Sequence, residues 1–130
     1  MNKILKYDGV NLTEVPFIPD PDGSVPYELM KELVNGYIEY IVCEPFEKQG
    51  INIFACEVGK LVNYGPTAHL MANGKVYDYI AGHFIMVSSD EEGRTLPLTD
   101  AQIEYLKEYF KNCNYIDGLP VLKYFEDTVS

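Results

Sequence analysis

Two segments with the 3.6-residue periodicity of a helix enclose a long succession of strand-like segments, and this order constrains the fold most. The first helical segment spans about residues 27–35, and the second spans about residues 99–112. Between them, apolar residues alternate or run continuously over short stretches that turn-forming residues separate. We therefore expect an α+β fold, in which both helices pack on a mixed or mostly antiparallel sheet.

The second helical segment carries the clearer local signals. Thr99 followed by Gln102 forms a capping box, in which each side chain accepts a hydrogen bond from the backbone N–H of the other residue. Ile103, Leu106 and Phe110 recur at helical spacing and predict the buried stripe. The first helical segment is weaker at its ends. There we expect a cap from Ser24 at the start and a left-handed Gly36 at the end.

The strand-like part contains one stretch that is longer than the others. Residues 75–89, "KVYDYIAGHFIMVSS", read as a single strand in which Gly82 suggests a bulge or a close backbone approach. Residues 51–58 are nearly all apolar and predict a central strand, and a short strand is expected around residues 61–62. On such a strand His83 is most simply a histidine satisfied by a neighbour, rather than a catalytic residue.

Length and charge limit the class of protein. The chain has 130 residues, which favours a single domain, and its 20 acidic residues against 10 basic ones give a net charge of −10. This charge opposes direct contact with nucleic acid or anionic membranes, but it permits a basic protein partner. No apolar run approaches the ~20 residues that span a bilayer, and no signal-peptide core is apparent. We therefore expect a cytoplasmic protein.

Motifs that carry chemistry are not found in the sequence. It has no C-x-x-C, H-x-x-x-H or H-E-x-x-H motif and no glycine-rich phosphate loop, so we assign no metal, no cofactor and no catalytic residue. Cys43, Cys56 and Cys113 are widely spaced, and we expect reduced thiols without a disulfide. A nucleophile formed by a strand cysteine with His69 or His83 is disfavoured, because apolar surroundings oppose the thiolate.

Polar side chains gather on irregular backbone in one region of the chain. Loops carry function more often than regular elements do, so this region, residues 63–69, is the first place to look for a ligand site. His83 is added because a histidine on this strand can also be part of a binding surface. The candidate ligand-binding residues are Asn63, Tyr64, Thr67, His69 and His83.

The order of four segments resembles a known family. "ELVNGYIEYI", "CEVGKL", "YDYIAGHFIMV" and "LTDAQIEYL" are similar to segments of domain-of-unknown-function family 3846, from bacteria, phages and mobile elements. The resemblance covers about residues 1–112 and leaves residues 113–130 as a C-terminal docking tail. It departs from the family in the loop after Leu61, where members often carry a Leu-Pro-Pro-Asn-like segment. The family implies no activity, only an accessory gene of a bacterial cytoplasm, or of a host cytoplasm if the gene is viral.

Two classes of function remain in view. The first is a non-enzymatic binding protein, a phage or mobile-element accessory factor that binds a host or bacterial protein, with a homodimer also open. The second is a pocket for a small, nucleotide-derived ligand, formed by the 63–69 loop with His83. Mimicry of DNA phosphates is weaker, because lysines interrupt the acidic residues. An unrecognised hydrolase is the weakest reading.

Overall fold

The computed structural model describes residues 2–125 of the chain, which form strands and three helices. The N-terminal elements are β1 (Lys3–Tyr7), β2 (Leu12–Pro16), α1 (Tyr27–Val34), β3 (Ile38–Ile41), α2 (Glu44–Glu47) and β4 (Ile51–Cys56). They are followed by β5 (Pro66–Ala72), β6 (Lys75–Ala81), β7 (Phe84–Ser89), β8 (Thr95–Leu96), α3 (Asp100–Asn112), β9 (Tyr115–Ile116) and β10 (Leu119–Lys123). The last residues of the expected docking tail, 126–130, lie outside the described residues.

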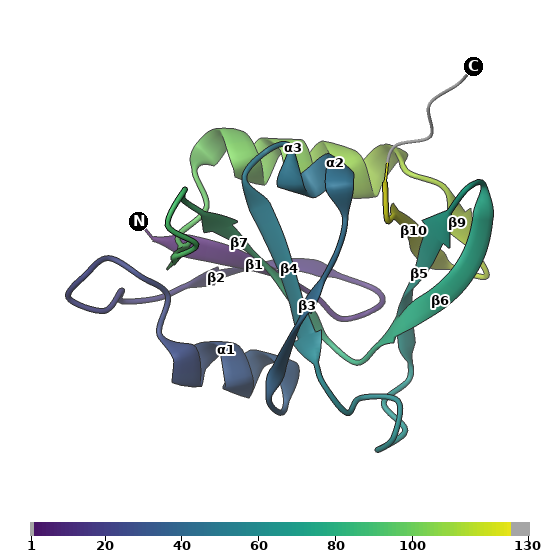
Figure 1. The fold of residues 1–130 in the computed structure, drawn as a ribbon, viewed down its shortest axis with the longest axis horizontal. Helices are drawn as coiled ribbons and strands as arrows, with labels where there is room; N and C mark the ends of the chain where they lie inside the picture. Colours follow the sequence, from purple (N-terminus) through teal and green to yellow (C-terminus); the bar gives the residue numbers. More distant parts are fainter. Residues whose placement is uncertain (1, 126–130) are drawn as a thin grey trace.

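The strands form two mostly antiparallel sheets, and together with the two main helices they confirm the predicted α+β class. The large sheet has the order β2-β1-β7-β4-β3, with β8 added to β7, and every neighbouring pair is antiparallel. The small sheet has the order β6-β5-β10-β9, and only the β5–β10 pair in it is parallel. Figure 1 shows the small sheet beside one end of the large sheet.

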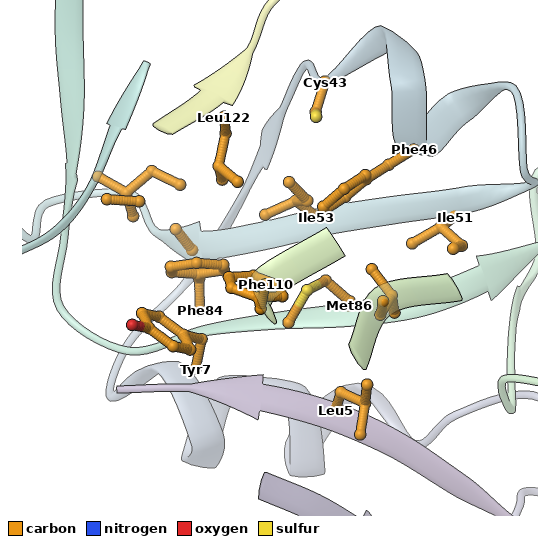
Figure 2. Close-up of a cluster of buried hydrophobic side chains, with 14 of the residues drawn as sticks. Leu5, Tyr7, Cys43, Phe46, Ile51, Ile53, Phe84, Met86, Phe110 and Leu122 are labelled. Carbon is orange, nitrogen blue, oxygen red and sulfur yellow. The ribbon is translucent and has the colours of Figure 1, made fainter. Parts of the chain in front are cut away.

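The two main helices cover opposite faces of the large sheet (Figure 1). Phe84 and Met86 of β7 belong to the cluster on the α3 face, while Ile85 and Val87 belong to the cluster on the α1 face. This is the alternation that a strand imposes on its side chains. Figure 2 shows Leu122 of the small sheet among the side chains of the first cluster, so the two sheets share one core.

The start of α3 confirms the predicted capping box. Thr99 Oγ1 accepts the N–H of Gln102 at 3.1 Å, and Gln102 Oε1 accepts the N–H of Thr99 at 2.9 Å. Ile103, Leu106 and Phe110 are the buried residues of this helix, as their spacing predicts.

The predicted bounds of α1 are confirmed to within one residue, but both predicted capping residues are wrong. The residue before the helix is Pro26, which provides no side-chain cap, and the hydroxyl of Ser24 donates to Asp22 Oδ1 in a local turn instead. At the other end, Asn35 takes the left-handed conformation with φ 61° and ψ 44°, one residue before Gly36. Asparagine tolerates this conformation better than most residues do, so it can end a helix as glycine can.

The prediction of one long strand over residues 75–89 is also wrong. The stretch divides into β6, an outer strand of the small sheet, and β7, the middle of the large sheet. Gly82 lies between them with φ +86°, a conformation that lets the chain turn from one sheet into the other. The strand expected around residues 61–62 is absent too, because residues 57–63 form turns in which the Val62 N–H donates to Val58 O.

The three cysteines are free thiols, of which Cys43 and Cys56 are buried and Cys113 is half-buried. Burial raises the pKa of Cys43 to about 12, so its reactive thiolate is scarce at neutral pH. Within residues 2–125, no helix has the length and apolar character needed to cross a membrane.

Candidate functional site

A hollow in the surface lies between residues 60–66 and the outer strand β6. Its volume is about 640 Å³, which is within the range of known ligand sites. Three of the predicted site residues, Asn63, Tyr64 and His69, contribute to its wall. The full lining is Lys60, Asn63, Tyr64, Gly65, Pro66, His69, Val76, Tyr77, Asp78 and Tyr79.

A smaller hollow of about 260 Å³ holds the other predicted residues. Thr67 and His83 line it together with Asp8, Asn35 and Gly82. The 64–66 segment lines both hollows. The structure therefore places His69 and His83 in two neighbouring hollows rather than in one.

Two of the predicted residues hold the loop in place. The hydroxyl of Tyr64 donates to Asn35 O at 3.0 Å, and its ring packs on Gly82, whose N–H donates to Gly65 O at 2.9 Å. Thr67 is buried, and its hydroxyl donates to Gly82 O at 2.7 Å. These contacts join the loop to the junction between β6 and β7, so they give Tyr64 and Thr67 a structural role.

The two histidines have different surroundings. A ring nitrogen of His69, Nε2, lies 2.9 Å from Ile116 O and links β5 to β9. His83 lines the same hollow as Asp8. The pKa of Asp8 is lowered first by hydrogen bonds from the backbone N–H groups of Asn11 and Val10 and less by the charge of His83. Among residues 2–125, no hydrogen bond joins the His83 ring to a carboxylate, hydroxyl or thiol, and no group of His, Cys, Asp and Glu is arranged to hold a metal ion.

A cluster of residues that the sequence did not predict lies on the wall of the hollow of about 640 Å³. Lys60 forms an ion pair with Asp78, and its Nζ lies 4.6 Å from the centroid of the Tyr79 ring. The N–H of Tyr79 also donates to Asp78 Oδ1 at 2.8 Å. Burial alone would raise the pKa of Asp78, but the hydrogen bonds from Lys60 and Tyr79 and the charge of Lys60 lower it below its ordinary value. The sequence offered one signal for this cluster, the alternation of Tyr77, Asp78 and Tyr79. Local pattern could not identify Lys60 as the partner of Asp78, because the two residues are 18 positions apart.

A third hollow of about 280 Å³ adjoins the same cluster. Lys60, Asp78 and Tyr79 line both this hollow and the one of about 640 Å³. Glu39 and Glu57 also line it, so its described lining contains three carboxylates and one lysine. The electrostatic character of this region is therefore acidic, like that of the whole chain.

Apolar side chains are exposed around the cluster. Leu61 is 83% exposed, Tyr77 is 51% exposed and Tyr79 is 40% exposed, and Val76 is similar to them. These residues line the two adjoining hollows, and exposed apolar residues gathered in this way mark an interaction site more often than scattered ones do. We call this region the Tyr79 surface and define it as Lys60, Leu61, Val76, Tyr77, Asp78 and Tyr79.

Comparison with known proteins gives a family but no activity. No curated protein and no solved structure matches the chain. The model of the family described as "Domain of unknown function (DUF3846)" matches residues 3–111, which is most of the chain and includes every residue of the Tyr79 surface. The resemblance of the four segments is thereby confirmed, and the chain belongs to the DUF3846 family.

Proposed function

We propose that this protein is a non-enzymatic binding protein and that it binds a bacterial protein through the Tyr79 surface. The observation that carries the proposal is the exposure of Leu61, Tyr77 and Tyr79 around two adjoining hollows. Tyrosine is enriched at the centres of protein interfaces, because it offers a large apolar ring with a polar end. In the biological setting that we propose, the protein is a phage or mobile-element accessory factor in the cytoplasm of its bacterial host.

Charge indicates the chemistry of the partner. The chain has a net charge of −10, and Glu39, Glu57 and Asp78 lie around the apolar part of the surface. Complementary potentials speed association and exclude partners of the same sign. The partner that fits is a protein segment with basic side chains among apolar ones.

The contact would be made by side chains rather than by strand addition. Although β6 is an outer strand, the N–H of Tyr79 is already bonded to Asp78, and the β5–β6 register shifts between Leu70 and Met71. Side-chain capping and bulges are ways in which proteins prevent an edge strand from pairing with another chain.

A pocket for a small, nucleotide-derived ligand is the second candidate, because the hollow of about 640 Å³ has a suitable volume and is lined by Asn63, Tyr64 and His69. Two observations weaken it. His69 already bonds Ile116 O, and His83 lies in the other hollow. A thermal shift of several degrees with a nucleotide, lost in the Asn63→Ala variant, would favour this candidate.

The test of the leading proposal compares immobilised variants in a bacterial lysate. The double variant Tyr77→Ala/Tyr79→Ala removes both rings, and Tyr27→Ala on α1 is the control, since Tyr27 is 48% exposed. We expect a protein that wild type and Tyr27→Ala retain equally and that the double variant retains at least about tenfold less, as measured by quantitative mass spectrometry. Equal retention by all three proteins, with circular dichroism showing that each is folded, would contradict the proposal.

A further inference from the structure

The ammonium group of Lys60 occupies a position where two different kinds of group attract a cation. The face of the Tyr79 ring lies 4.6 Å away, and the carboxylate of Asp78 forms an ion pair with the same group. Aromatic faces attract cations through their quadrupole, and a carboxylate attracts them through its charge. Asp78 and Tyr79 therefore attract a cation to one place, which we call the cation subsite, and Tyr77 lines the hollow beside it.

The lysine that fills this subsite is weakly held. The side chain of Lys60 is 44% exposed and that of Asp78 is 40% exposed, so water and salt screen their attraction. Glu39 and Glu57 line the adjoining hollow together with Lys60, so Asp78 is not the only carboxylate of this region. Exchange of Lys60 for another cation would therefore lose little electrostatic energy within the protein.

We propose that the Tyr79 surface binds an arginine side chain of its partner between Tyr79 and Asp78, and that Lys60 holds this place in the free protein. The inference rests on the proposed function and specifies the group of the partner that is recognised. Arginine fits better than lysine for two reasons. Its planar guanidinium stacks on an aromatic ring while it bonds a carboxylate through two N–H groups, and it is less strongly hydrated than an ammonium group.

Competition from Lys60 affects the affinity of the protein for arginine. As long as Lys60 competes for the subsite, the protein binds an isolated arginine poorly, and only a partner with further contacts to Leu61, Val76 and Tyr77 displaces the lysine. Lys60 would thus act as a selectivity device, because an internal competitor penalises weak ligands of the right charge.

The test uses Nα-acetyl-arginine methylamide as the probe and follows the ring resonances of the tyrosines by NMR. Lys60→Gln removes the internal cation. Lys75→Gln is the matched control, because it changes the net charge equally. Lys75 is exposed on β6, the strand of Asp78 and Tyr79, and does not line the hollow of about 640 Å³. We expect Lys60→Gln to bind the probe roughly three- to tenfold more tightly than wild type and Lys75→Gln, with the largest shifts at Tyr79. Nα-acetyl-citrulline methylamide, the neutral analogue, should not discriminate among the three proteins.

Two results would overturn the inference: equal affinities of Lys60→Gln and Lys75→Gln, or an increase that persists in Lys60→Gln/Asp78→Asn. These results leave the lysate experiment unaffected. If capture depends on Tyr77 and Tyr79 but Lys60→Gln behaves like Lys75→Gln, the protein-binding function stands and the arginine subsite is wrong. If the probe binds Lys60→Gln more tightly while no protein is captured through the tyrosines, the subsite is supported and the proposed function is wrong.

Discussion

Gly82 is the residue at which the chain leaves the small sheet and enters the large one. Its φ of +86° is strained for any residue with a Cβ, and a Cβ built there would lie only 2.8 Å from Cδ2 of Tyr64. Because Tyr64 lines both hollows that contain the predicted site residues, the conformation of this glycine also sets the shape of the site.

We predict that Gly82→Ala destabilises the protein through both effects. The backbone strain costs about 1 kcal/mol, and displacement of Tyr64 adds to it, for a total of roughly 2–3 kcal/mol. Gly74→Ala is the control, since Gly74 has φ +74° and open space around the position of its Cβ, so that only the backbone cost remains. Urea denaturation measures both free energies of unfolding. Equal losses in the two variants would show that the packing of Tyr64 on Gly82 is unimportant.

At the scale of the element, α3 offers the sharpest test of packing. Leu106 is fully buried among residues of both sheets, while Glu104 on the same helix is exposed. We predict that Leu106→Ala lowers the free energy of unfolding by ~2–5 kcal/mol. Glu104→Ala introduces alanine on the exposed face of the helix, and it should change the free energy of unfolding by about 0.5 kcal/mol or less. A loss below about 0.5 kcal/mol for Leu106→Ala in denaturant titration would contradict the assigned face.

The elements also show why some predictions succeed and others fail. The start and buried face of α3 depend on residues within one segment, from Thr99 to Phe110, and local pattern was sufficient there. The division of residues 75–89 depends on pairing with β5 on one side and with β1 and β4 on the other, which no local pattern contains. The same reason explains the site. Asn63, Tyr64 and His69 were accessible to local reasoning, whereas the Lys60–Asp78 pair required the fold.

At the scale of the whole molecule, the two sheets depend on a common core. Leu122 on β10 belongs to the small sheet, yet it is fully buried in one cluster with Phe84 of the large sheet and Phe110 of α3 (Figure 2). The hydroxyl of Tyr109 adds a hydrogen bond from α3 to Val121 O at 2.9 Å. A site on the small sheet therefore depends on the folding of the large sheet.

We predict that Leu122→Ala weakens both sheets together. Removal of this side chain leaves a cavity where the sheets meet and should cost ~2–5 kcal/mol, whereas Leu61→Ala, the same substitution at an 83% exposed position, should cost about 0.5 kcal/mol or less. NMR intensities of Tyr79 in the small sheet and Ile53 in the large sheet, followed through a urea titration, should disappear at one common midpoint. An earlier loss of the Tyr79 signal, with the Ile53 signal at its wild-type midpoint, would show instead that the small sheet unfolds independently of the large one.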